Sequence, residues 1–167
     1  MVRHKVFISY YHHDDEKYKI RFEKLFGDLF INKSVRSGDI NSDNSDEYIK
    51  RIVRENNISD SSVVVVLIGP KTLCRKHIDW EIYAGLYKNA GLVGLILPEH
   101  VNYGEKNYKI GTMPNRFEDN LISKYAKVWD WTENRTQMSN IIDNVFVNRN
   151  SNLKDNSRKQ MQRNRCD

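Results

Sequence analysis

Short apolar runs alternate along the chain with longer stretches in which apolar residues recur every three or four positions. The clearest run covers residues 63–68, VVVVLI, and ends at Gly69 and Pro70. An unbroken run of β-branched residues is typical of a strand that is covered on both faces, as in a parallel sheet. Residues 91–97 form a second such run and end at Pro98. The pattern therefore predicts a parallel sheet with helices on both sides.

Weaker runs and amphipathic stretches complete the predicted order. Further strands are expected at residues 5–10, 30–36 and 126–131, and helices from Asp14 or Asp15 to Leu29, from Ser45 to Val53, from Lys71 to Asn89 and from Glu133 to Val147. Alternation of this kind predicts an α/β fold, a flavodoxin-like doubly wound five-stranded parallel sheet with strand order 2-1-3-4-5. Residues 99–120 are expected to be a long irregular stretch, of the kind that is usually functional or poorly ordered.

The alternation runs through residues 1–147 without an internal repeat, so one domain is expected there. Residues 148–167 have almost no apolar content and are expected to form a basic, flexible C-terminal tail. This segment holds six basic and two acidic residues, which gives +4 of the chain's net charge of +5. The other 147 residues hold 21 basic and 20 acidic side chains. Nucleic-acid binding, which a basic chain first suggests, is therefore the least favoured function.

Composition excludes several classes of protein. The chain has 167 residues, 39% of them hydrophobic, and a mean hydropathy of −0.71. No apolar run approaches the roughly 18 residues of a membrane span, and no apolar signal-peptide segment precedes the first strand. Cys74 and Cys166 are the only cysteines, so we expect no disulfide framework and no cysteine zinc cluster. These features predict a cytoplasmic protein in a reducing compartment, without a membrane partner.

The predicted topology selects candidate functional residues without reference to any family. Ligands of doubly wound sheets bind outside the carboxyl ends of the strands, at the point where the strand order reverses. The residues at this edge end the first strand or lie in the first half of the third helix: Ser9, Tyr10, Tyr11, His12, His77, Asp79, Trp80 and Glu81. The sequence contains no Walker loop, no G-x-G-x-x-G fingerprint and no G-x-S-x-G nucleophile elbow.

Metal and cysteine chemistry are not favoured at this edge. His12, His13 and His77 lie near it, but no carboxylate or cysteine at metal-ligand spacing accompanies them. Adjacent exposed histidines are more often ordinary surface residues, so we expect no metal. Cys74 is expected to be a small packing residue rather than a nucleophile.

Four segments resemble the sequence boxes of TIR domains and follow the same order. They are VFISY at 6–10 with Asp14 and Asp15 after it, VRSGDI at 35–40, IGPKTL at 68–73 followed by WEI at 80–82, and VWDW at 128–131. The third of these, together with the preceding VVVV run, is similar to a bacterial TIR-like group that includes the TIR (ThsB-like) component of Thoeris anti-phage defence systems. The resemblance covers roughly residues 4–131.

This resemblance implies an enzyme that cleaves the nicotinamide–ribose bond of NAD, with NAD as substrate and no cofactor. Glu81 matches the family's catalytic glutamate. Cleavage of an N-glycosidic bond builds positive charge on the ribose, which a nearby carboxylate stabilises. The ADP-ribose part is expected to be released, cyclised or joined to an acceptor, and to act as a diffusible nucleotide signal on a separate effector. The resemblance also allows for a phage-derived trigger and for homo-oligomeric assembly.

Further residues are expected to contact the substrate: Phe7, Ser9, Tyr10, Tyr11, His12, Gly38, Asp39, Ile40, His77 and Trp80. Several have two open interpretations. Phe7 either stacks on a base or belongs to the core, and His77 either pairs with Glu81 or, as we favour, lies at the surface. The loop of residues 38–40 either gates the pocket or is an ordinary polar loop. Ala84 and Gly85 either leave room for a ribose or allow close packing of the helix.

An alternative function needs no catalysis. The chain would then be a TIR-like protein-interaction module that assembles through the loop after the second strand and through the third helix. A change of Glu81 to Gln separates the two functions, because it removes catalysis and leaves such an assembly surface intact.

Overall fold

A central parallel sheet organises the computed structural model, which describes residues 3–34, 58 and 60–166. Within these residues the strands are β1 (Lys5–Ser9), β2 (Ile31–Asn32), β3 (Val63–Ile68), β4 (Gly91–Ile96) and β5 (Lys127–Asp130). They are hydrogen-bonded in the order β2-β1-β3-β4-β5, with every pair parallel. The predicted fold class and strand order are therefore confirmed.

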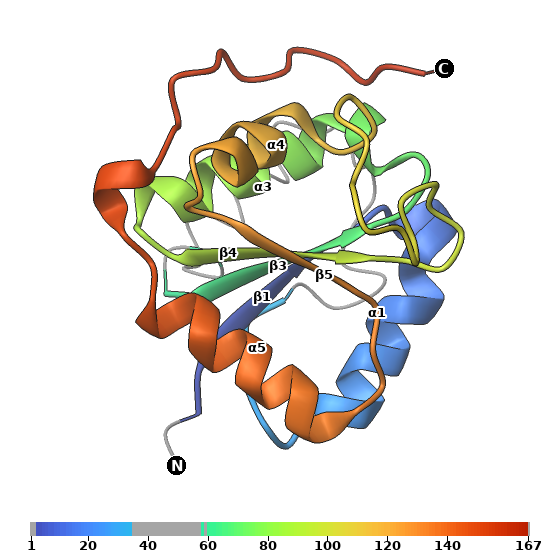
Figure 1. Ribbon diagram of the computed structural model, residues 1–167, viewed down its shortest axis with the longest axis vertical. Helices are drawn as coiled ribbons and strands as arrows, with labels where there is room; N and C mark the ends of the chain where they lie inside the picture. Colours follow the sequence, from blue (N-terminus) through green and yellow to red (C-terminus); the bar gives the residue numbers. More distant parts are fainter. Residues whose placement is uncertain (1–2, 35–57, 59, 167) are drawn as a thin grey trace.

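Helices cover both faces of the sheet (Figure 1). On one side lie α1 (His12–Phe26) and α5 (Arg135–Val147), and on the other lie α3 (Lys76–Tyr87) and α4 (Asn115–Ile122). Two short 3-10 turns, η1 (Thr72–Cys74) and η2 (Ser151–Leu153), stand before α3 and after α5. None of the helices in these ranges is long and apolar enough to cross a membrane.

Several predicted boundaries shift in the structure. The first helix begins at His12 rather than at Asp14 or Asp15, because Tyr11 is the extended residue that starts it. The predicted single helix over residues 71–89 divides into η1 and α3, since Arg75 between them has an extended backbone. The helix expected from Ser45 lies outside the described residues.

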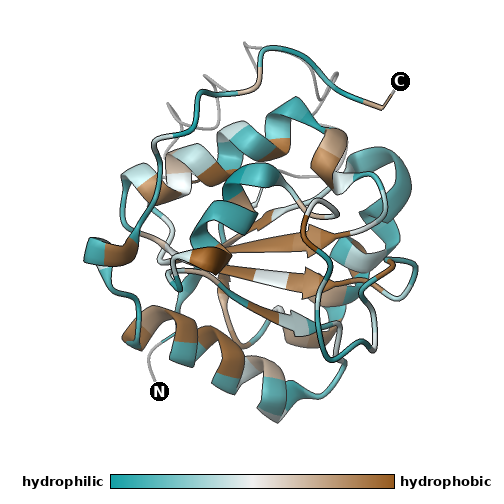
Figure 2. Ribbon diagram, turned by 45° about the horizontal axis from the view of Figure 1, so that its top comes forward, coloured by the Kyte–Doolittle hydropathy of each residue, from teal (hydrophilic) through white to brown (hydrophobic). Residues whose placement is uncertain are grey.

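The core consists of two apolar layers, one on each face of the sheet. All six residues of β3 are buried. Its even-numbered residues belong to the layer under α3 and α4, and its odd-numbered residues belong to the layer under α1 and α5. Figure 2 shows the resulting pattern, with mostly apolar strands in the middle and helices in which polar and apolar stretches alternate. Each buried Val, Leu or Ile side chain contributes about 1.5–3 kcal/mol, so this strand anchors both layers.

The stretch expected to be irregular over residues 99–120 contains most of α4, which continues to Ile122 and which the sequence analysis missed. Phe117 of α4 is fully buried in the layer under α3. Glu118 accepts hydrogen bonds from the backbone N–H groups of Gly111 and Met113, at 2.8 and 2.9 Å, and ties the preceding loop to the helix. Pro114 immediately before α4 and the glycines upstream are typical of loops, and they conceal the short amphipathic pattern.

The C-terminal segment differs most from its prediction. Instead of leaving the domain, the chain passes through η2 and then follows the outer side of α4 and α3 up to residue 166 (Figure 1). Arg158 forms a two-point ion pair with Asp119, at 2.7 and 2.9 Å. Cys74 and Cys166 form a disulfide, so the expectation of no disulfide is wrong. Two cysteines 92 residues apart give no sequence sign of pairing. The boundary at residue 147 stays a prediction.

The disulfide closes most of the domain into a covalent loop. In the chain-entropy account, a cross-link over a sequence separation of 92 residues stabilises a fold by roughly 4–5 kcal/mol, because it restricts the unfolded chain. The closed loop contains α3, β4, α4, β5, α5 and η2. The elements on the α3 side of the sheet are therefore linked to the chain end by covalent as well as non-covalent contacts.

The packing of α3 on β3 generates the first testable prediction. A Cβ atom on Gly85 of α3 would lie 2.7 Å from Cγ2 of Val64, a stiff side chain in the middle of the sheet. We expect Gly85→Ala to lower the free energy of unfolding by about 1–3 kcal/mol, because overpacking outweighs the better helix propensity of alanine. Urea unfolding followed by circular dichroism measures this change. An equal or higher free energy of unfolding would contradict the packing described here.

Candidate active site

A hydrogen bond between Ser9 and Glu81 lies at the edge where β1 ends. The Ser9 hydroxyl donates to Oε1 of Glu81 at 2.8 Å. Ser9 is 0% and Glu81 1% exposed. The two residues are 72 positions apart in the sequence and meet because α3 crosses the carboxyl end of β1. This is the place where doubly wound sheets bind ligands, between the adjacent strands β1 and β3.

The alternation of β1 explains why Ser9 faces α3. Phe7 belongs to the apolar layer under α3, while Val6 and Ile8 belong to the opposite layer. Ser9 lies two residues beyond Phe7 and therefore points to the same face. On α3, Ile78 and Ile82 enter that apolar layer, and Glu81 lies between them. The polar pair thus begins where the apolar layer ends.

His77 lies in the same cluster, contrary to the expectation that it is a surface residue. Its side chain is 0% exposed, and its Nε2 donates to the backbone carbonyl of Tyr10 at 3.0 Å. Its ring stacks on the ring of His12, with centroids 4.9 Å apart. His77 precedes Glu81 by one helical turn, so the two share a helix face. The spacing of four residues predicts the shared helix face. The burial of His77, by contrast, depends on segments that surround it only after folding.

Arg75 adds a positive charge beside these residues, and the sequence analysis missed it. Its guanidinium carbon lies 4.5 Å from the centroid of the half-buried Tyr11 ring. Arg75 is the extended residue just before α3, which brings it to the same edge as the end of β1. A guanidinium stacked on an aromatic ring is a group that binds phosphates in many proteins. The edge therefore offers a carboxylate, imidazoles and a cation within one region.

Other predicted site residues point elsewhere. Phe7 is 1% exposed within the core, as in the second of its two interpretations. The Tyr10 ring belongs to the layer under α1 and α5 and also packs edge-on against the His12 ring, with centroids 4.3 Å apart, while its carbonyl accepts from His77. Trp80 donates its indole N–H to the carbonyl of Met161 at 2.7 Å, toward the C-terminal segment. Gly85 packs against Val64 and leaves no room for a ribose.

Two groups of predicted residues remain to be placed. Gly38, Asp39 and Ile40 lie outside the described residues. His13 is exposed and bonds to Asp14 at 2.7 Å, apart from the stacked pair of His12 and His77. Within residues 3–34, 58 and 60–166, no group of three or more His, Cys, Asp or Glu side chains is arranged to hold a metal ion.

Asp15, which the sequence analysis names in the first box but not as a site residue, is a second buried carboxyl group at this edge. It is 3% exposed and lies against Gly69, where a methyl group would overlap both carboxyl oxygens. Burial, with the negative charges of Asp14 and Glu99, raises the pKa of Asp15 from 3.8 to about 7. Gly69, the residue after β3, is therefore required at its position by the side chain of α1 that packs on it.

These features define a TIR-like α/β domain with its candidate site at the carboxyl edge of the sheet. Residues 7–102 match the family described as Thoeris protein ThsB, TIR-like domain. This match covers more than half of the chain and includes Ser9, His77 and Glu81, and the chain belongs to this family. It is therefore a TIR-type protein related to Thoeris defence. No curated protein matches the chain.

The raised pKa of Asp15 predicts a pH dependence of stability. Between pH 4 and pH 7 the folded state holds a proton on Asp15 that the unfolded state has released, so stability falls as the pH rises through this window. Asp15→Asn does not titrate. We expect the melting temperature of the variant to rise relative to that of the parent from pH 4 to pH 7, and to level off above that.

Thermal unfolding of both proteins over a pH series checks this. The comparison needs only the change with pH, so any constant effect of the substitution cancels. A difference in melting temperature that does not vary with pH would show that Asp15 has an ordinary pKa in the folded protein.

Proposed function

We propose that this chain is a TIR-type enzyme that cleaves the nicotinamide–ribose bond of NAD, with Glu81 as the catalytic carboxylate. NAD is the substrate, and the reaction uses no further cofactor. The ADP-ribose-derived product is a signalling nucleotide that activates a separate effector in anti-phage defence. The observation that carries the proposal is the buried hydrogen bond between Ser9 and Glu81 at the carboxyl edge of β1, inside the region that matches the Thoeris family.

The chemistry needs one well-placed negative charge. The bond between ribose C1′ and the pyridinium nitrogen breaks, and its electron pair neutralises that nitrogen, so nicotinamide leaves without being protonated. Positive charge then develops on the ribose ring, as in glycoside hydrolysis. The Glu81 carboxylate stabilises this charge. Groups that are preoriented in this way commonly contribute about 3–4 kcal/mol to the transition state.

Ser9 acts on the orientation of Glu81. Its hydroxyl donates to one carboxylate oxygen, Oε1, which restricts the orientation of the carboxylate plane. Both residues are withdrawn from water, and electrostatic interactions are stronger in such surroundings than in solvent. The pair therefore supplies a preformed negative site rather than a mobile surface charge.

The burial of Glu81 affects the basal turnover of the enzyme. With 1% of its surface exposed, the residue contacts a ribose only after neighbouring groups have moved. Basal turnover is therefore expected to be low, and a trigger that appears on infection would raise it. Assays in phage-challenged cells suit this behaviour better than assays of the resting protein.

The fate of the ribose cation follows from what attacks C1′. Water gives ADP-ribose and releases a proton. An oxygen or nitrogen of the same molecule gives a cyclic product, and an external acceptor gives a conjugate. In each case the attacking atom forms the new bond to C1′ and loses its proton if it carried one. All three products require the same first step at Glu81.

The central prediction concerns Glu81→Gln. The amide keeps the shape and the hydrogen bond to Ser9 but loses the charge, so we expect nicotinamide release from NAD to fall by at least about 100-fold. Mass spectrometry of metabolites from phage-challenged cells measures nicotinamide and ADP-ribose derivatives. Circular dichroism of the purified variant is expected to match that of the parent.

The matched control is Glu105→Gln, which removes the same charge from an exposed loop position. It is expected to leave product formation unchanged. If Glu81→Gln retained full product formation and full protection against phage, the interaction-module function would replace the catalytic one.

A second prediction concerns Ser9→Ala. Loss of a hydrogen bond to a charged group costs about 1.5–3 kcal/mol, which corresponds to a decrease in kcat/KM of roughly ten-fold or more. Ser139→Ala in α5, on the other side of the sheet, is the control and is expected to leave the rate unchanged. An unaltered rate in Ser9→Ala would mean that Glu81 needs no orienting partner.

A further inference from the structure

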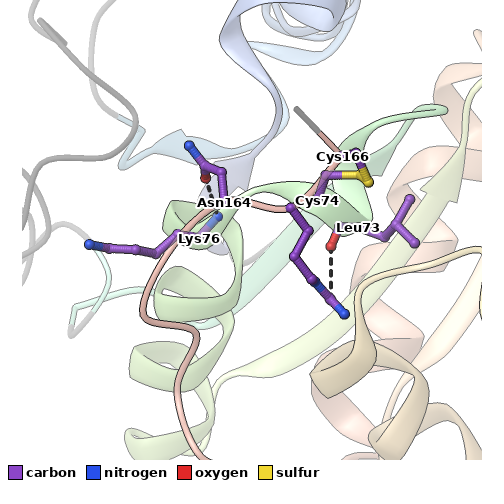
Figure 3. The surroundings of a disulfide bond; sticks show 6 residues. Leu73, Cys74, Lys76, Asn164 and Cys166 are labelled. Atoms are coloured by element: carbon purple, nitrogen blue, oxygen red, sulfur yellow. Dashed lines mark hydrogen bonds between the residues drawn. A yellow bond between two sulfur atoms is a disulfide. The ribbon is translucent and has the colours of Figure 1, made fainter.

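Residues 161–166 lie along the start of α3 and are joined to it at several points. We refer to these six residues as the strap. Cys166 is bonded to Cys74 of η1, with Cα atoms 5.7 Å apart (Figure 3). The Arg165 backbone N–H donates to the Cys74 carbonyl at 2.8 Å, and its guanidinium donates to the Leu73 carbonyl at 3.2 Å. The strap is thus fixed to the turn that leads into α3.

The strap also supplies a cap for α3. The residue at the N-terminal boundary, Arg75, makes no side-chain capping bond. Instead Oδ1 of Asn164 accepts a hydrogen bond from the Lys76 backbone N–H at 2.8 Å, from 88 residues away (Figure 3). Asn is among the best capping residues because its side-chain oxygen accepts from the free N–H groups of a first helical turn. This helix therefore takes its cap from the C-terminal segment.

Two more contacts reach the turn just before Glu81. The Met161 N–H donates to Oδ2 of Asp79 at 2.8 Å, and the Met161 carbonyl accepts from the Trp80 indole at 2.7 Å. Asp79 also holds the fully buried Arg116 of α4, at 2.9 Å. Together the strap contacts fix residues 76–80, which precede Glu81 directly in the helix.

We propose that the strap positions α3, with Asn164 as a positioning residue and the Cys74–Cys166 disulfide as a redox-sensitive lock. With the disulfide formed, the first turn of α3 is ordered and Glu81 is aligned with Ser9. With the disulfide reduced, the strap is held by hydrogen bonds alone and the first turn opens more often. The consequence for catalysis rests on the function proposed above, whereas the consequence for helix order does not.

The redox step balances with a dithiol as the reductant. A thiolate of the dithiol attacks the Cys166 sulfur, and Cys74 leaves as a thiolate. The second thiol of the reductant then closes its own disulfide and releases Cys166. Two electrons and two protons pass from the dithiol to the two cysteines. Cys166 is exposed while Cys74 is 2% exposed, so the attack comes from the Cys166 side.

The position of the disulfide in the fold bears on its role. In reducing compartments a disulfide is usually transient, and it forms in redox-sensing or catalytic proteins. The bond here joins the end of the chain to the turn before the helix that carries the candidate catalytic residue, so making or breaking it changes a constraint on the start of α3. This local constraint adds to the overall stabilisation that a cross-link of this length gives.

Hydrogen–deuterium exchange of the full chain, with and without dithiothreitol, tests the helix-order part. Mass spectrometry after alkylation first establishes two blocked cysteines before reduction and two free ones after it. We expect reduction to speed exchange of the amides in residues 76–79 by at least ten-fold under conditions in which the protein stays folded, whereas the core strand β3 exchanges only through global unfolding and reports the loss of overall stability separately. Cys166→Ser is expected to reproduce this without reductant. Unchanged exchange in 76–79, or free cysteines in the oxidised protein, would overturn the proposal.

Substitutions of Asn164 distinguish the effect of its capping hydrogen bond from the effect of its side-chain packing. Asn164→Ala is expected to speed exchange at residues 76–79 in the oxidised protein, and Asn164→Asp, which restores a capping oxygen, is expected to return it to the parent value. Lys159→Ala, at an exposed position of the C-terminal segment outside the strap, is the control and is expected to leave the exchange rates of residues 76–79 unchanged. Failure of Asn164→Asp to rescue the exchange rate would remove Asn164 from its positioning role.

Activity provides the final readout. If exchange responds to reduction as expected, kcat for nicotinamide release should fall several-fold on reduction or in Cys166→Ser, with KM little changed. An exchange response with redox-independent kcat would overturn the coupling to Glu81. An exchange response in a protein that releases no nicotinamide in either state, even in extracts of phage-challenged cells, would support the strap and contradict the proposed NAD cleavage.

Discussion

The close approach of α3 to the carboxyl end of β1 is the constraint on which the site depends. Gly85 allows this approach, since any larger residue would overlap Val64 of β3. Once the helix is seated, Glu81 reaches Ser9 and His77 reaches the Tyr10 carbonyl. A small displacement of α3 would separate both pairs. The geometry of the site therefore depends on backbone packing, because its two hydrogen bonds form only when α3 lies close to the sheet.

The fold was predictable because its signal is strong and local. The run over residues 63–68 can hardly be anything except a strand covered on both faces, and the structure buries all six residues. Glu81 and Ser9 were placed at one edge by topology alone. The burial of His77, the Arg75–Tyr11 contact and the Cys74–Cys166 disulfide could not be predicted, because each depends on segments that meet only after folding. Helix α4 was missed because Pro114 and nearby glycines resemble a loop.

The C-terminal segment changes how the basic charge of the chain is understood. The net positive charge of the chain favours an anionic partner, and the location of most of this charge in residues 148–167 favours a flexible tail instead. In the structure Arg158 pairs with Asp119, Arg165 binds the Leu73 carbonyl and Lys154 binds the side chain of Asn89. Much of this basic character is therefore used in contacts with the domain. The same segment caps α3, which links the chain end to the helix that carries Glu81.

A double-substitution cycle on Ser9 and Glu81 tests the central claim most directly. Nicotinamide release is measured in extracts of phage-challenged cells that contain the parent, Ser9→Ala, Glu81→Gln or both substitutions together. If Ser9 acts through the carboxylate, the double variant is no slower than Glu81→Gln alone, because nothing remains for Ser9 to orient. If the two losses multiplied instead, the residues would act independently and the buried pair would not be the catalytic unit.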